Sequence, residues 1–145
     1  MSKVEDFLSA EEEQEIVLAI RQAELNTSGE IRVHLEATTL LPHYQRALEV
    51  FQMLKMFNTQ QQNAVLIYVA VEDHKFVIYG DEGINKVVPE NFWDATKNVM
   101  QEQFKQGNFK QGIIKGVLKA GEELKAHFPW QINDEDELSN EISKG

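Results

Sequence analysis

Two consecutive apolar runs in the middle of the chain give the clearest pattern of hydrophobic positions. Residues 64–71 form an unbroken apolar run of strand length, rich in β-branched side chains, which is typical of a strand buried on both faces. A polar turn at residues 72–75 separates it from a second strand-like run at residues 76–79. The pattern predicts an antiparallel hairpin. Residues 80–83, in which two glycines bracket two carboxylates, predict a ligand-binding loop at its end.

An alternating pattern precedes this hairpin. Residues 30–38 switch between apolar and polar side chains, which predicts a strand with one polar face that is less buried than the central run. Pro42 opens a helical pattern between this strand and residues 64–71. Because a strand, a crossover helix and a second strand form a right-handed unit, the strands at residues 30–38 and 64–71 should run parallel.

Three further helices are predicted around these strands. The first starts at a capping box formed by Ser9 and Glu12. The second begins at Pro89 and ends at Gly107, and the third covers about residues 109–127. Together, the elements predict an α/β protein: a three-layer α/β/α sandwich with a small mixed sheet, of Rossmann-like class.

The length of 145 residues suits one domain with a substantial core. We expect this domain to span residues 1–130, followed by an acidic tail at residues 131–145 that carries a short docked helix. The chain has no cysteine, which excludes disulfides, thiolate zinc sites and cysteine nucleophiles. No segment has the pattern of a signal peptide or a membrane span, so we predict a cytoplasmic protein without a membrane partner.

The net charge of −10 points to cations as partners and argues against nucleic acid, because phosphate contacts need a basic surface. The predicted topology offers a place for a cation: two strand starts and one strand end share an edge of the sheet. That edge gathers the oxygen-bearing side chains of Glu30, Asn63, Asp81 and Glu82, with Glu90 close behind. Hard oxygen ligands of this kind suit Ca²⁺ or Mg²⁺. The alternative is an acidic loop satisfied by water and helix-terminal amides.

Several segments resemble the TPM domain family, named after a thylakoid lumen protein, a photosystem II repair protein and a nematode receptor-associated protein. The resemblance covers about residues 7–127, and its carriers are residues 8–12, 27–31, 62–67, 75–84 and 104–113. It implies an α/β/α sandwich, a divalent-cation site often occupied by calcium, and a weak acid phosphatase activity claimed for some plant members.

The sequence departs from the family pattern at the implied site. Where relatives commonly have Asp-Asn-Gly, this chain has Gln62-Asn63-Ala64, and where they have Gly-Tyr-Gly it has Asp81-Glu82-Gly83. The family's later aspartate corresponds to Glu90. Most relatives also carry a signal peptide and a membrane anchor or Gly-rich tail, so the chain resembles a cytoplasmic, bacterial-type variant.

Three functions remain open at this point. The leading hypothesis is a domain that binds calcium or magnesium at the predicted edge without efficient catalysis. One alternative is a metal-dependent acid phosphatase at the same cleft, and the other is a metal-independent module that binds an unidentified protein. The histidines give no catalytic set, because His34, His43, His74 and His127 stand alone in the sequence.

Overall fold

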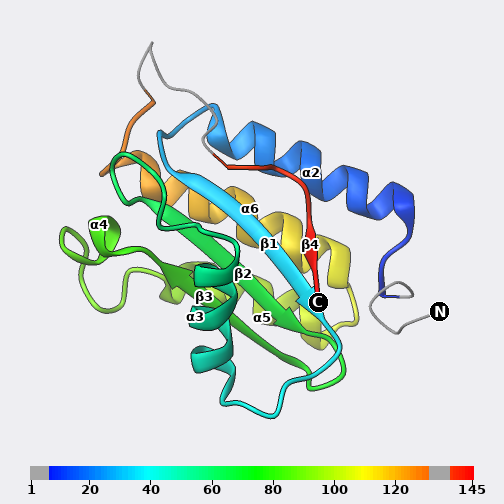
Figure 1. The fold of residues 1–145 in the computed structure, drawn as a ribbon. Helices are drawn as coiled ribbons and strands as arrows, with labels where there is room; N and C mark the ends of the chain where they lie inside the picture. The colour runs from blue at the N-terminus through cyan, green and yellow to red at the C-terminus, as the bar shows by residue number, and fades with distance from the viewer. Residues whose placement is uncertain (1–6, 131–137) are drawn as a thin grey trace.

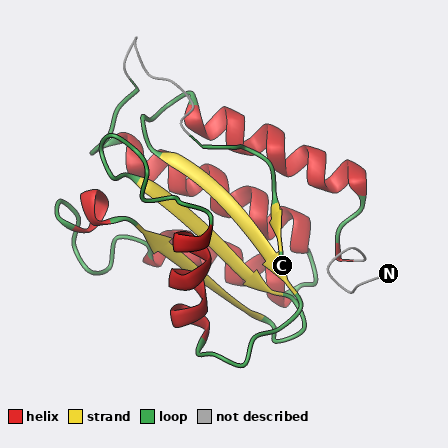
Figure 2. Cartoon of the chain, in the orientation of Figure 1, coloured by secondary structure: helices red, strands yellow, loops and turns green. Residues whose placement is uncertain are grey.

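A computed structural model describes residues 7–130 and 138–145, which form a mixed sheet between two layers of helices (Figures 1 and 2). The strands are β1 (Glu30–Glu36), β2 (Ala64–Ala70), β3 (Lys75–Gly80) and β4 (Ser143–Lys144), in the spatial order β3-β2-β1-β4. The helices are α2 (Ala10–Glu24), α3 (His43–Met53), α4 (Glu82–Asn85), α5 (Asp94–Lys105) and α6 (Phe109–Lys125). The predicted α/β class is confirmed.

The sheet separates two hydrophobic cores, because successive side chains of a strand point to opposite faces. Val65 and Ile67 of β2 belong to the larger core, which helices α2, α5 and α6 cover. Leu66 and Tyr68 point the other way and pack against α3. Since β2 contributes to both cores, all seven of its residues are buried. The unbroken apolar run in the sequence has this physical origin.

The strand directions follow the predicted topology. β1 and β2 are parallel, with Glu30 opposite Ala64 and Glu36 opposite Ala70. β2 and β3 are antiparallel, and Val65 lies opposite Gly80. The starts of β1 and β2 and the end of β3 therefore lie at one end of the sheet, as the sequence predicts.

The polar face of β1 is more buried than expected. His34 and Glu36 are each only 4 % exposed, and Arg32 is the one residue of β1 that is only partly buried, so this strand is only slightly less buried than β2. The cause is β4, which pairs in parallel with β1 at His34 and Leu35 and makes β1 an interior strand. Because β4 is short and comes from the far end of the chain, its pairing with β1 cannot be recognised from the residues around β1.

β4 also corrects the expectation for the acidic tail. Among the described tail residues, 138–145, the structure has this short strand where the sequence favoured a docked helix, and residues 131–137 lie outside the described part. The Gly145 amide donates a hydrogen bond to the Leu35 carbonyl at 2.8 Å. Lys144 forms an ion pair with Glu13 of α2 at 2.6 Å. These contacts hold residues 143–145 along β1, where Figure 1 shows β4.

Two helix starts show how the sequence sets element boundaries. The predicted capping box of α2 is present: the Glu12 amide donates to Ser9 Oγ, and the Ser9 amide donates to Glu12 Oε1. The Gly-bracketed segment at residues 80–83 was expected to be a loop, but α4 begins within it, with Asp81 as its N-cap.

In the described residues, no helix is both long and apolar enough to cross a membrane.

Candidate functional site

Residues from three segments meet at the end of the sheet where β1 and β2 begin. The Glu30 amide donates a hydrogen bond to the Asn63 carbonyl at 3.3 Å, and the Asp81 amide donates to the Ala64 carbonyl at 2.9 Å. These two bonds place Glu30, Asn63 and Asp81 on neighbouring chain segments across the sheet. The structure thus brings together three of the five residues that the sequence assigns to a metal site.

Asn63 and Asp81 each carry a buried oxygen atom without a hydrogen-bond partner. Asn63 is 1 % exposed, and its amide nitrogen donates to Ser28 Oγ at 3.2 Å, while its Oδ1 makes no hydrogen bond within the described part of the chain. Asp81 is 7 % exposed; its Oδ1 accepts from the Glu82 amide at 2.7 Å, and its Oδ2 is likewise unsatisfied among the described residues. Buried polar atoms without partners are rare and costly, so each calls for an explanation.

Burial also changes the acidity of the Asp81 carboxyl. Loss of solvation raises the pKa of Asp81, the hydrogen bond from the Glu82 amide opposes this rise, and the Glu82 carboxylate adds to it. The ionised form that is expected at neutral pH is therefore held in an unfavourable environment. A nearby positive charge would relieve that cost.

The backbone beside these side chains is tightly packed. A Cβ on Gly83 would lie 2.1 Å from the Gln61 carbonyl oxygen and 2.5 Å from that of Gln62, so only glycine allows α4 to approach this loop. Gln62 has a positive φ of 51°, which turns the chain sharply just before β2. The result places two backbone carbonyl oxygens beside the start of α4. Carbonyls of this kind are common calcium ligands.

Glu82 and Glu90 do not join the buried group. Both side chains are exposed to solvent. Glu90 instead lines a separate cavity of about 180 Å³ together with Phe92 and Trp93. Among residues 7–130 and 138–145, no three acidic or histidine side chains gather closely enough to hold a metal ion. A cation at this edge would therefore depend on amide and backbone carbonyl oxygens as well as carboxylates.

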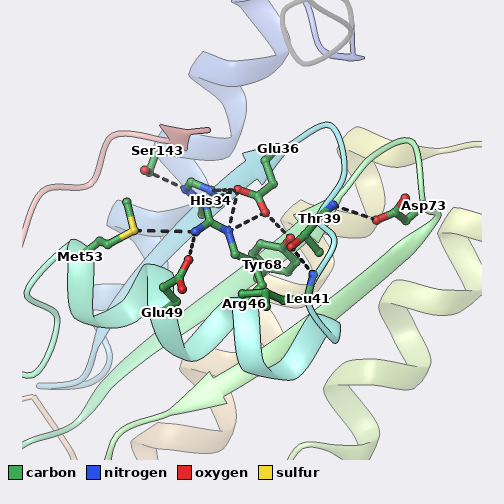
Figure 3. A network of polar contacts seen from close by, with 10 residues as sticks. All are labelled: His34, Glu36, Thr39, Leu41, Arg46, Glu49, Met53, Tyr68, Asp73 and Ser143. Atoms are coloured by element: carbon green, nitrogen blue, oxygen red, sulfur yellow. Dashed lines mark hydrogen bonds and ion pairs between the residues drawn. The ribbon is translucent and has the colours of Figure 1, made fainter.

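A second polar cluster, the β1 network, lies on the face of the sheet that α3 covers (Figure 3). His34 contacts Ser143 Oγ through Nδ1 at 2.9 Å and Glu36 Oε1 through Nε2 at 3.0 Å. Arg46 of α3 donates to both Glu36 oxygens at 2.9 Å, and the Tyr68 hydroxyl donates to Glu36 Oε2. The network joins α3, β2 and β4 to β1.

The β1 network has strongly shifted acidities. Burial by itself would raise the pKa of Glu36, but hydrogen bonds from Arg46, Tyr68 and His34 lower it to about 2. Burial raises the pKa of Tyr68, and the bond to Glu36 raises it further. Burial lowers the pKa of His34, which favours the neutral ring. Perturbed acidities often mark functional sites, but here the polar groups are buried and satisfied by one another, which indicates a structural role.

Sequence reasoning missed the β1 network because it treated His34 as an isolated residue. One signal was available: His34 and Glu36 are two residues apart on a strand and so share a face. The other partners give no such signal, since Ser143 lies 109 residues further along the chain. His43 is also paired, to Asp73 at 2.9 Å.

Comparison with known proteins identifies similar chains. The family model of the TPM domain matches residues 1–123. The NMR structure of the BA42 protein from the psychrophilic bacterium Bizionia argentinensis is 64 % identical, with a TM-score of 0.93 and full coverage of both chains. None of the curated proteins matches this chain.

Two further NMR structures show the same fold at low identity. The N-terminal domain of a P. gingivalis protein is 19 % identical, with a TM-score of 0.68, and the match covers 84 % of this chain and 79 % of that domain's chain. The N-terminal domain of the Corynebacterium glutamicum cg2496 protein is 13 % identical, with a TM-score of 0.62 and coverage of 95 % and 80 %. At these identities the likeness concerns the fold alone.

Proposed function

The chain belongs to the TPM domain family, and from that premise we propose that it binds a divalent cation, Ca²⁺ or Mg²⁺, where β1 and β2 begin and β3 ends. The observation that carries this proposal is the pair of buried oxygens without hydrogen-bond partners, Asn63 Oδ1 and Asp81 Oδ2, at that edge. Oxygen atoms that are buried and have no hydrogen-bond partner are well suited to coordinate a hard cation.

The proposed ligands fall into two groups, buried residues and exposed residues. Asn63, Asp81 and Glu30 are buried and would contribute from the protein side, while Glu82 and Glu90 are exposed and would contribute from the solvent side. A bound cation supplies positive charge, which lowers the cost of an ionised Asp81 and of its repulsion with Glu82. We propose that the domain binds the cation without catalysing a reaction efficiently.

Thermal unfolding in calcium, magnesium or chelator tests the proposal. A cation at ten times its dissociation constant stabilises the folded state by about 1.4 kcal/mol. For a chain of this size, the melting temperature should rise by roughly 4 °C. Asp81→Asn should lose this rise while keeping an acceptor for the Glu82 amide, since asparagine also caps helices.

Asp94→Asn is the matched control. Asp94 is an exposed aspartate in the first turn of α5, so the same substitution changes the net charge equally at a residue outside the proposed ligand set. Its response to calcium should equal that of the wild type. Equal responses of Asp81→Asn and the wild type would contradict the proposed site. A melting temperature indifferent to both metal and chelator would favour the metal-independent interaction module.

Turnover of p-nitrophenyl phosphate separates the proposal from the phosphatase alternative, which the name of the family model suggests. We expect no turnover above background in the presence of metal. Hydrolysis that requires added metal and disappears in Asp81→Asn would instead support a metal-dependent phosphatase at this edge.

A further inference from the structure

A cavity of about 310 Å³ opens at the end of β2 opposite to the proposed cation site. Its wall is formed by the end of β2, the β2–β3 turn, the end of α5 and the start of α6. Ala70 follows Ala64 by six residue steps, so the cavity lies about 20 Å from Ala64 along the strand. This volume is at the lower end of the range for small-molecule pockets, roughly 300–1,000 Å³.

Aromatic rings dominate the apolar wall of the cavity. Four of the eight phenylalanines of the chain line it, namely Phe7, Phe76, Phe104 and Phe109. Phe76 meets Phe104 edge to face with ring centres 5.4 Å apart, and Phe7 lies 4.8 Å from Phe109. All four rings are only partly buried, unlike the closed cores on either side of the sheet. Their exposed surface offers contact area for an apolar ligand.

The charged side chains that line the cavity have the opposite sign to the net charge of the chain. Lys75 and Lys105 lie at its rim, with His74 beside them, and no aspartate or glutamate is among the described residues that line it. The whole chain has 24 acidic and 14 basic residues, so a cavity whose described lining holds no carboxylate stands apart. In the described part of the chain, neither Lys75 nor Lys105 forms an ion pair, whereas Lys110 and Lys119 do.

We propose that this cavity binds a small amphipathic carboxylate. An aromatic or branched apolar body would pack on the phenylalanine rings, and a single carboxylate would lie against Lys75 and Lys105. The shape and charge of the cavity together favour this class. A cation would be repelled by the rim, and a strongly polar anion would leave the aromatic wall without contacts. The inference is independent of the cation site at the other end of β2.

Three probes with the same phenylbutyl body test the proposal by backbone amide NMR: 4-phenylbutyrate, 4-phenylbutanol and 4-phenylbutylamine. We expect 4-phenylbutyrate to give saturable shifts confined to Phe7 and to residues 69–76 and 101–109. The alcohol should bind more weakly and the amine most weakly. Equal affinity of acid and amine would overturn the proposal. So would the absence of localised saturable shifts with 4-phenylbutyrate at about 10 mM, a concentration that nearly saturates a site with a dissociation constant of about 1 mM.

A lysine variant with a matched control tests the role of the rim. Both Lys75 and Lys105 are exposed, so replacing them should not affect folding. Lys75→Gln combined with Lys105→Gln should weaken 4-phenylbutyrate binding by roughly fivefold, as expected for partly exposed charge pairs. Lys97→Gln, an exposed lysine on α5 outside the cavity, should leave the affinity unchanged. Equal affinities of the double variant and the Lys97 variant would overturn the assignment of the carboxylate to the rim.

Discussion

Asp81 uses its two carboxylate oxygens in different ways. One oxygen caps α4 by accepting from the Glu82 amide, and the other is buried without a hydrogen-bond partner in the described part of the chain. The cap stabilises the fold, while burial of the second oxygen opposes it. A residue that stabilises and destabilises at once is typical of a site whose ligand completes it.

We therefore predict that Asp81→Asn raises stability in the absence of metal. Because burial raises the pKa of Asp81, the ionised carboxylate destabilises the folded state, and a neutral amide removes that cost while keeping the cap. Urea unfolding in chelator at pH 7 should show a higher free energy of unfolding for Asp81→Asn than for the wild type. A loss of more than about 1 kcal/mol, as for a destroyed cap, would contradict this account.

Glu36 shows the reverse case, in which the charged form is well satisfied. Replacing it by glutamine leaves the Arg46 guanidinium, 20 % exposed, without its main counter-charge. We predict that Glu36→Gln destabilises the protein by about 2 kcal/mol in urea unfolding at pH 7, less than for a fully buried pair. Glu49→Gln is the control, because Glu49 contacts the same arginine from an exposed position and should cost less than about 0.5 kcal/mol.

The pKa of Glu36 also predicts how acid affects stability. Since this pKa falls from the ordinary 4.5 to about 2 in the folded protein, the ionised carboxylate favours folding. Its contribution is complete above pH 4.5 and is lost as the pH falls towards 2. The difference in unfolding free energy between the wild type and Glu36→Gln should therefore narrow over this window. A difference that stays constant from pH 7 to pH 3 would show that the pKa of Glu36 is not lowered.

At the scale of elements, α6 depends on small residues where it crosses its neighbours. A Cβ on Gly116 would lie 2.5 Å from Met100 Sδ of α5, and a Cβ on Gly121 would lie 2.8 Å from the Ala23 Cβ of α2. Both glycines lie inside a helix, where glycine costs about 1 kcal/mol relative to alanine. Close packing of three helices over one face of the sheet offsets that cost.

The two glycines should respond differently to alanine. At Gly121 the neighbours are the backbone and Cβ of Ala23, which cannot move without shifting α2. We predict that Gly121→Ala destabilises by about 1 kcal/mol, because overpacking exceeds the gain in helix propensity. Gly116→Ala should cost less, since the flexible Met100 side chain can move. Chemical denaturation of the two variants checks this order, and the reverse order would contradict it.

Element boundaries show which parts of the sequence could be interpreted locally. The α2 capping box and the β2 run were predictable because their partners lie within a few residues. The α4 start was not, since residues 80–83 contain two glycines and suggest a loop, whereas the helix forms with Asp81 as its N-cap and Ile84 buried. β4 was not predictable either, because its two residues gain their conformation from pairing with β1.

At the scale of the whole molecule, topology decided how much of the candidate site could be predicted. Two parallel strands and one returning strand place Glu30, Asn63 and Asp81 at one end of the sheet, and this followed from hydrophobic pattern alone. The exposed positions of Glu82 and Glu90 depend on the turn that α4 makes, which the pattern does not encode. The charges around the cavity at the other end of β2 could not be predicted from the pattern either, because they depend on how α5 and α6 pack.

Backbone amide NMR during a calcium or magnesium titration is the sharpest test of the proposed cation site, because it reports the place of binding as well as its strength. We predict saturable shifts at residues 28–30, 61–64 and 80–90, which surround the unsatisfied oxygens of Asn63 and Asp81 and include the proposed ligand Glu90. These shifts should be absent in Asp81→Asn. Saturable shifts elsewhere in the protein would contradict the proposed site. The absence of any shift at several millimolar metal, a concentration above the weak limit of protein calcium sites, would contradict it as well.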